Sequence, residues 1–499
     1  GSRAAFPPRA SGTPLPVHAM EFSREAPCNG VAFGSKTIGF VGSLAMLLNN
    51  ILGPGIANFP AAFQRAGWII PSVLIAICVV SSLASGEMLV MAMRAMPGND
   101  RFEKRVEYST LCGHYLWSRA AKCTIVLFLL AMLSANISNI IQTSHVLDGT
   151  IDGIFSDSCA VEIYPKFLRF FCHTEPDDVT PFGTGKVLLS VGTAICGLFS
   201  VPLSYFNLDD NIIFQNISLV FILLSIAMWL WIFLVLGLES SRVPAIHGDS
   251  GLSAFHGVSG TILFNFMFIS TLPSWICEKQ PHIVAIRVIF WTLALAAVGF
   301  IGVGLWGGMA FKEYYESDNT LLSEMYHIQG GRMMKLAVSF SVDAYAISAN
   351  LASIPVFSIM MRYNLIEQKL MGPRAAGFLS VTLPWVVSVL LYCGTGFTDL
   401  VNFAGTFTSS IVNLIVPSVL FISSQRARPQ RSVEACELTL SSSALDDCCS
   451  PGGAVVRDRS GHIGSARQKR IWLSLAWVNI AVMTVLTVVA IADQLANGS

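Results

Sequence analysis

The residues best suited to bind a small solute lie within the first long apolar run, where residues 49–56 read NNILGPGI. Two glycines that flank a proline are expected to unwind a helix. The half-helix that starts after Gly55 would present unpaired N–H groups and a positive dipole end, which suit a carboxylate. The half-helix that ends near Leu52 would present carbonyl oxygens, which suit a cation or an ammonium group. An α-amino acid carries both groups, so the predicted binding residues are Gly53, Pro54, Gly55 and Ile56.

A second interruption is expected in the sixth apolar run, where residues 264–274 read FNFMFISTLPS. Small hydroxyl residues beside a proline favour unwinding, and a backbone at membrane depth can unwind only where it lines a cavity or is covered by protein. Breaks in the first and sixth helices are typical of two inverted repeats with a solute site at their interface. Carbonyls around Ser270 and Thr271 would help to bind the ammonium, and Phe266 or Phe268 would gate the pocket.

Polar side chains in other apolar runs are candidates for ion coupling. The amide oxygen of Asn49 is a hard ligand for a small cation, although an interhelical hydrogen bond would explain this residue equally well. Asp343 has no Lys or Arg near it in sequence, and an acid inside a membrane is a functional candidate by default. It would bind Na⁺, carry a proton, or simply reach water. Ser348 and Ser353 on the same helix would supply neutral oxygens, and Asn139 either faces the site or joins two helices.

Composition indicates that lipid, rather than water, surrounds most of this chain. Apolar residues make up 53% of the 499 residues, charged residues make up only 12%, and the mean hydropathy is +0.61. A soluble domain carries roughly a quarter charged residues, so too little polar surface remains to cover a water-soluble fold. The 31 basic and 31 acidic residues cancel, which argues against a nucleic-acid partner because such a partner requires a basic surface.

A helix needs about 20 mostly apolar residues to cross a bilayer. The sequence therefore predicts an all-α integral membrane protein of about eleven transmembrane helices, in which helices one to five and six to ten form two inverted repeats. The eleven runs lie at 37–65, 69–93, 123–147, 186–206, 211–238, 259–277, 283–311, 333–361, 376–394, 398–424 and 471–492.

The polar segments define the other parts of the chain. Residues 1–35 are expected to form a disordered cytoplasmic tail, and 425–469 a disordered cytoplasmic loop. The transporter core would occupy 36–424, and 470–499 would hold the eleventh helix and a short C-terminus outside or in a lumen. With the N-terminus in the cytoplasm, 23 of the 31 Lys and Arg residues fall on the cytoplasmic side, as the positive-inside rule requires.

The loop at 148–185 would then face the opposite side of the membrane. It is acidic and contains two cysteines, Cys159 and Cys172. Outside the cell or in a lumen these would form a disulfide, and otherwise they are two free thiols in a mobile loop. The sequence does not distinguish a plasma membrane from a vacuolar or lysosomal membrane.

Residues 49–67 read NNILGPGIANFPAAFQRAG, and this stretch resembles the first-helix signature of the amino acid/auxin permease family, which includes the sodium-coupled neutral amino acid transporters. Weaker similarity appears at residues 201–204 (VPLS) and 273–279 (PSWICEK). Two features depart from the family, namely Pro54 at a position that is usually small and the length of the 425–469 loop. The positions that carry the first-helix resemblance are Asn49, Gly53, Gly55, Pro60, Phe63 and Gly67.

The resemblance implies a LeuT-like fold, an amino-acid substrate and symport with Na⁺ or H⁺. The predicted function is therefore ion-coupled transport by alternating access, with Na⁺ at Asn49 and the eighth helix or H⁺ at Asp343. The partners expected are a small amino acid and membrane lipid, with no cofactor beyond the coupling ion. A channel for small solutes and an amino-acid sensor with a transporter fold remain alternatives. An enzyme is not expected, because the sequence has no HExxH, GxSxG or phosphate-loop motif.

Overall fold

The computed structural model describes the apolar part of the chain and most of its connections. The predicted tail at 1–35 and loop at 425–469 lie almost wholly outside the described residues. These are 35–155, 157–172, 182, 185–246, 258–263, 265–266, 268–312, 321–326, 328, 330–393, 407–408, 410–426 and 466–497.

Seven helices among the described residues are long and apolar enough to cross a membrane, or eight if the bent first helix counts as one span. The helix over Pro373–Leu391 joins three pieces, α13 (Pro373–Gly377), the π-helical η4 (Phe378–Thr382) and α14 (Leu383–Leu391). The other six are α3 (Ile69–Arg94), α5 (Ser118–Phe155), α7 (Ile212–Leu236), α10 (Ala285–Ala310), α12 (Arg332–Glu367) and α17 (Ala466–Asn497).

The remaining predicted spans are short or interrupted, so the count of eleven is not confirmed. The fourth and tenth runs contain the shorter apolar helices α6 (Val191–Tyr205) and Ile411–Arg426, the second of which opens with η5 (Ile411–Ile415). The described part of the sixth run ends in two short pieces, η3 (Ile269–Thr271) and α9 (Leu272–Glu278). The interruption of the sixth helix is thus present where the sequence predicts it.

The surface of α7 has the character of a helix that faces lipid. Its exposed side chains are large and apolar, and Ile213 and Val220 are 73% and 64% exposed. Its buried side includes the polar Gln215, Ser218 and Ser225. In water this arrangement would be unstable, whereas in lipid polar groups belong between helices, where they bond to one another.

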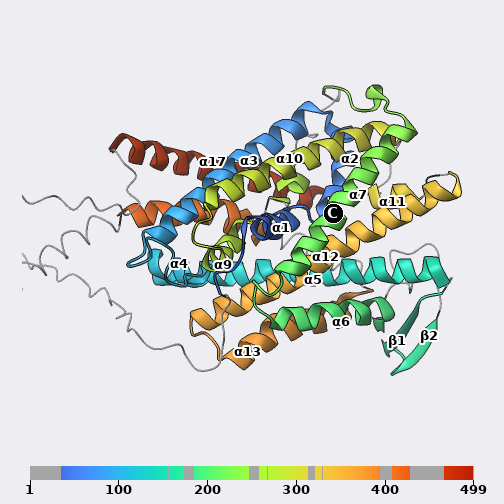
Figure 1. The fold of residues 1–499 in the computed structure, drawn as a ribbon, viewed down its shortest axis with the longest axis horizontal. Helices are drawn as coiled ribbons and strands as arrows, with labels where there is room; N and C mark the ends of the chain where they lie inside the picture. The colour runs from blue at the N-terminus through green and yellow to red at the C-terminus, as the bar shows by residue number, and fades with distance from the viewer. Residues whose placement is uncertain are drawn as a thin grey trace, which may run out of the picture. The chain divides into compact units, whose positions relative to one another are not determined.

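Helix α12 is the central packing element of the described chain. It lies beside α5 and α7 and also contacts α6, while α10 packs against α2 (Phe59–Ala66), α3 and α7 (Figure 1). The first half of the broken helix, α1 (Phe40–Ile51), contacts α7, α10 and α12. The break in the first helix is therefore surrounded by protein, as an unwound backbone at membrane depth requires.

A small antiparallel sheet covers one end of the helices, which we call the sheet end. Its strand order is β2-β1-β3, with β1 at Cys159–Tyr164, β2 at Arg169–Cys172 and β3 at Val187–Ser190. The all-α prediction did not include it. Residues 187–190 alternate between buried and less buried positions, but all except Ser190 are apolar, so this strand reads as the start of the fourth apolar run.

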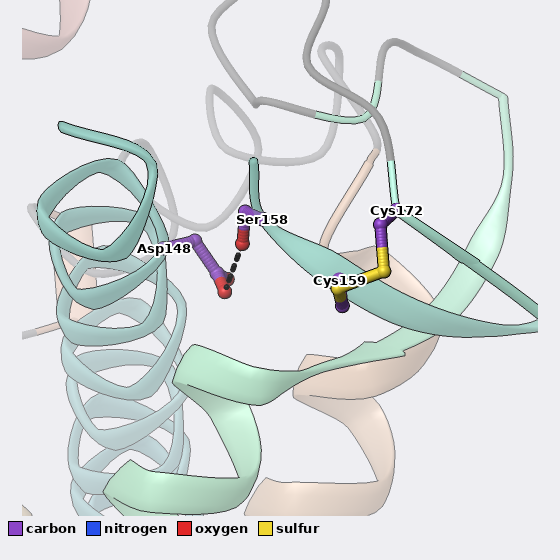
Figure 2. Close-up of a disulfide and its surroundings, with 4 residues drawn as sticks. All are labelled: Asp148, Ser158, Cys159 and Cys172. Atoms are coloured by element: carbon purple, nitrogen blue, oxygen red, sulfur yellow. Dashed lines mark hydrogen bonds between the residues drawn. A yellow bond between two sulfur atoms is a disulfide. The ribbon is translucent and has the colours of Figure 1, made fainter. Parts of the chain in front are cut away.

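A disulfide and a buried acid secure the sheet end. Cys159 and Cys172 face each other across β1 and β2 and are joined by a disulfide (Figure 2). Asp148 in α5 is fully buried and accepts hydrogen bonds from the Ser158 hydroxyl (3.2 Å), the Gly192 amide (2.8 Å) and the Tyr392 hydroxyl (2.5 Å). This carboxylate links α5 to β1, α6 and the segment after α14.

Candidate functional site

The first helix breaks within the sequence that predicts the break. Helix α1 ends at Ile51, Gly53 is extended (φ −74°, ψ −174°), and the 3₁₀-helix η1 (Pro54–Asn58) follows with Pro54 at its start. The axes of Phe40–Ile51 and Gly55–Ala66 differ by 47°. Proline favours the first position of a helix because it has no N–H to satisfy. The regular helical bonding of the main chain is thus interrupted between Ile51 and Pro54.

The carbonyl end of the break is bonded to α12. The Tyr345 hydroxyl lies 3.0 Å from the Leu52 oxygen and 2.9 Å from the Gly53 oxygen. The Gly53 oxygen also accepts the Ile56 amide at 3.3 Å. The two carbonyls that sequence analysis assigned to a cation or ammonium are therefore held by a phenol in this conformation.

The break in the sixth segment faces the break in the first. A methyl group added at Gly55 would lie 2.5 Å from the side-chain oxygen of Asn265, so the Gly55 backbone packs directly on this side chain. Asn265 is buried and donates to the Thr261 carbonyl (2.7 Å). Position 55 therefore has no room for a side chain, because any residue larger than glycine would displace the Asn265 side chain.

The predicted residues after Asn265 are all buried. The Ser270 amide donates to the Asn413 side-chain oxygen (2.8 Å), and the Thr271 hydroxyl donates to the Phe268 carbonyl (2.6 Å). The Ser270 hydroxyl has no hydrogen-bond partner among the described residues. It is a polar group in the interior that a bound solute could satisfy.

Phe266 belongs to an aromatic cluster beside the break. Its ring lies 5.6 Å from Phe300 in an edge-on arrangement, and Phe300 stacks on Phe59 at 4.5 Å. The cluster joins the sixth segment, α10 and the first residue of α2. Because all three rings are enclosed, a gating role for Phe266 would require them to move together.

Asn49 takes part in an interhelical link and also retains an unpaired oxygen. Its amide nitrogen donates to the main-chain oxygen (2.9 Å) and the side-chain oxygen (2.8 Å) of Gln215. The Gln215 nitrogen continues to the Ala352 carbonyl on α12 (2.8 Å). The side-chain oxygen of Asn49 is buried without a hydrogen-bond partner among the described residues. The bond to another helix therefore leaves this oxygen available to a cation.

The other predicted ion-coupling residues are spread along α12, and Asn139, a predicted substrate-binding residue, lies in α5. Asp343 is half-buried and accepts from the Ser339 hydroxyl (3.3 Å), whereas Ser353 is buried and bonds to its own helix at Ala349 (3.0 Å). Ten residues of helix separate Asp343 from Ser353 by about 15 Å, so the structure does not bring them together. Ser348 is half-buried and Asn139 is buried.

The sequence did not predict a role for Tyr345, Gln215, Asn265 or Asn413. Three of them are amides inside apolar runs, which is a signal for interhelical bonding, but a sequence does not reveal which backbone groups they reach. Tyr345 lies two residues after Asp343 and carried no separate signal.

The end opposite the sheet end contains a cluster of charges that we call the clamp. Its centre is Arg105, which pairs with Glu107 (3.0 Å) and Glu278 (3.3 Å). Both carboxylates are fully buried, and Glu107 also accepts from the Ser274 hydroxyl (2.5 Å). The guanidinium lies 4.1 Å from the centre of the Tyr363 ring. Two buried acids, Glu278 at the end of α9 and Glu107 in the connection between α3 and α5, are thus held by one cation.

The clamp extends to the chain that precedes the first helix. The Ile38 amide donates to the Glu278 carbonyl (3.2 Å), and the Gln280 amide donates to the Ile38 carbonyl (3.0 Å). The Asp209 amide donates to the Glu278 carboxylate (3.0 Å), and the Ser35 amide donates to the Asp209 carboxylate (2.9 Å). Burial raises the pKa of Glu278 to about 7, although Arg105 acts in the opposite direction. These contacts fasten the start of the first helix to the end of the sixth.

Comparison with known proteins identifies a family and a fold. Residues 36–435 match the family described as transmembrane amino acid transporter protein. The chain is 23% identical over 378 residues to sodium-coupled neutral amino acid transporter 7 of Bos taurus, covering 74% of each protein. It is 21% identical over 455 residues to transmembrane protein 104 of Gallus gallus, covering 77% of this chain and 87% of that protein.

A solved structure shows the same fold at low sequence identity. It is Mhp1, a nucleobase-cation-symport-1 family transporter in a closed conformation with bromovinylhydantoin bound. The match has a TM-score of 0.51 and 12% identity, and it covers 78% of this chain and 81% of that chain. The LeuT-like fold expected from the sequence is therefore confirmed.

Proposed function

Because the chain belongs to the transmembrane amino acid transporter protein family, we propose that it is an ion-coupled symporter that moves an amino acid by alternating access. It is an integral multi-pass membrane protein of a transporter family, and not an enzyme. The observation that carries the proposal is the break at residues 52–56, which is enclosed by protein and faces the second interrupted helix at Asn265.

The substrate would lie along this break. Its ammonium would bind the Leu52 and Gly53 carbonyls, where the negative end of α1 adds to the attraction. Its carboxylate would bind the N–H groups around Gly55 and Ile56, at the positive end of the following helix. The hydroxyl of Ser270, which is buried without a partner among the described residues, would add a third contact from the sixth segment.

Sodium is the coupling ion that we favour. The relative of Bos taurus is named as sodium-coupled, and the Asn49 oxygen is a buried acceptor with no partner among the described residues. Leaving such an acceptor unpaired costs about 1–3 kcal/mol, which a bound cation would recover. Ser348 and Ser353 are candidates to complete the site. Proton coupling through Asp343, which is half-buried, is the alternative.

The clamp would close one side of the pathway. The positive-inside rule favours a cytoplasmic N-terminus. In that orientation the clamp would lie on the cytoplasmic side and the disulfide-bearing sheet end outside or in a lumen. A disulfide suits that side because the cytoplasm keeps thiols reduced. Transport then requires the contacts of Arg105, Glu278 and Ile38 to open and re-form in each cycle.

Reconstitution in liposomes tests the function. Purified protein is given each neutral L-amino acid under an inward Na⁺ gradient or an inward H⁺ gradient, and accumulation is measured with and without an ionophore that dissipates the gradient. We expect concentrative uptake driven by Na⁺ and abolished by the ionophore. Uptake that is driven only by H⁺ and lost in Asp343→Asn would show that the coupling ion is the proton and not sodium. Equilibration without accumulation under either gradient would indicate a channel and reject the proposal.

A further inference from the structure

The hydroxyl of Tyr345 lies where the ammonium of a bound substrate would lie under the proposed function. This hydroxyl joins the two carbonyls that the helix break exposes, those of Leu52 and Gly53, at 3.0 and 2.9 Å. Tyr345 is fully buried, and its ring packs at 4.5 Å on the equally buried ring of Trp229 in α7. The hydroxyl is thus held at the break from α12, across the interior of the protein.

The phenol has too few hydrogens to bond fully to both the Leu52 and the Gly53 carbonyl. A hydroxyl has one hydrogen to donate, while each carbonyl oxygen has two lone pairs. Tyr345 must share that hydrogen between Leu52 and Gly53. An ammonium has three N–H donors and a full positive charge, and charge-assisted hydrogen bonds are roughly twice as strong as neutral ones. An ammonium can therefore displace the phenol, whereas an uncharged group gains little by doing so.

We propose that the Tyr345 hydroxyl occupies the ammonium position while the site is empty, gives way when an amino acid binds, and so makes a charged amine a requirement for tight binding. The inference rests on the proposed function, because it assumes that the break binds an amino acid. In the empty protein the hydroxyl satisfies the buried Leu52 carbonyl, which would otherwise be costly, and it adds a second donor to the Gly53 carbonyl beside the Ile56 amide. A solute with a carboxylate and no amine leaves the phenol in place and reaches only the N–H end of the break.

Removing the hydroxyl tests the competition. In Tyr345→Phe the ring and its contact with Trp229 remain, but an incoming ammonium no longer has a competitor. We expect the Kd for the amino acid to fall about three- to tenfold, the range that one neutral hydrogen bond represents. The Kd for the matched carboxylic acid without the amine should not fall. The measurement is calorimetric binding to purified protein, with neutral L-amino acids each paired with its desamino acid, such as alanine with propionate.

Tyr108→Phe is the matched control. Tyr108 is also fully buried, and its hydroxyl also donates to a main-chain oxygen, that of Val412 at 2.7 Å, but it lies in α4 (Tyr108–Tyr115). Loss of this bond should leave both Kd values unchanged. An unchanged or raised Kd for the amino acid in Tyr345→Phe would overturn the inference, and a raised value would make the hydroxyl a direct ligand of the substrate.

A fluorescence measurement that keeps Tyr345 in place covers the case in which Tyr345→Phe does not fold. Displacement of the phenol should change the fluorescence of Trp229, obtained as the difference between the wild type and Trp229→Phe. The amino acid should produce this change and its desamino partner should not; equal changes, or none on amino-acid binding, would contradict the inference. Binding with this signature but without transport would reject the proposed function alone, whereas no amino-acid binding would reject both.

Discussion

Gly55 of the first helix and Asn265 of the sixth segment pack so closely that a methyl group at Gly55 would lie 2.5 Å from the Asn265 oxygen. Real Cβ atoms do not approach other atoms this closely, so the Asn265 side chain would have to move. The relationship joins two stretches that are 210 positions apart in sequence. The shape of the proposed substrate site therefore depends on the absence of a side chain at Gly55.

Gly55→Ala should therefore damage the site. Overpacking of this kind costs about 1–3 kcal/mol, and we expect amino-acid uptake in liposomes to fall at least tenfold. Gly302→Ala is the control, because a methyl there would meet its nearest atom at 3.9 Å, an ordinary contact. The second change Asn265→Ala should restore folding yield to Gly55→Ala by making room. Full uptake by the single variant would show that the Asn265 side chain moves aside without harm to the site.

Asn49→Ala tests whether Asn49 binds the coupling ion or only joins two helices. If the Asn49 oxygen binds Na⁺, the Na⁺ concentration for half-maximal uptake should rise at least tenfold. Asn479→Ala is the comparison, since Asn479 is a buried amide that donates to the Ser85 hydroxyl, the Leu414 carbonyl and the Ser418 hydroxyl. It should lower stability without changing the Na⁺ dependence. The same Na⁺ dependence in both variants would assign Asn49 to helix packing alone.

Arg105→Ala should open the clamp. Glu107 and Glu278 would be left buried without their shared cation, and breaking a buried pair in this way costs about 3–5 kcal/mol. We expect maleimide to label Cys277 faster, as followed by mass spectrometry, because Cys277 is buried beside Val106 in the closed clamp. Slow labelling equal to that of the wild type would show that the clamp does not hold this end closed.

The control for the clamp is an ion pair at the surface. Arg242 pairs with Glu239, which is 58% exposed, and such pairs contribute little to stability. Arg242→Ala should leave the labelling rate of Cys277 unchanged.

Glu278 should make the stability of the clamp depend on pH. Its pKa in the folded protein is raised from 4.5 to about 7, chiefly by burial. Between these values the folded state binds more protons than the unfolded state, so stability falls as pH rises. The Tm of the wild type relative to Glu278→Gln should therefore decrease from about pH 4.5 to about pH 7 and then level off. A constant difference across this range would contradict the assignment.

The sequence predicted the two breaks because their causes are local. Glycine and proline disrupt a helix wherever they occur, so residues 53–55 and Pro273 located the interruptions without a structure. The partners of the breaks depend on distant parts of the chain. Nothing in the sequence places Tyr345 on the Leu52 carbonyl or Asn265 on Gly55, because these contacts are set by how α12 and the sixth segment pack.

Charges and short strands were the least predictable features. Arg105 and Glu107 read as ordinary charges in a connecting segment, and Glu278 is noticeable only within the PSWICEK stretch that carries the family resemblance. Only the fold encloses the two acids around one guanidinium. Residues 187–189 have apolar side chains that suit a span and a strand equally well, so hydropathy cannot separate the two. For Asp343 the sequence showed an acid within an apolar run but not its depth, which depends on where α12 meets water.

A structure of the protein with its amino acid bound, determined by electron cryo-microscopy in Na⁺, tests the central claim most directly. We predict that the substrate ammonium lies within hydrogen-bonding distance of the Leu52 and Gly53 carbonyls and that its carboxylate lies at the amides of Gly55 and Ile56. The Tyr345 hydroxyl should have moved away from both carbonyls. An amino acid bound elsewhere, with Tyr345 still on Leu52 and Gly53, would contradict the account.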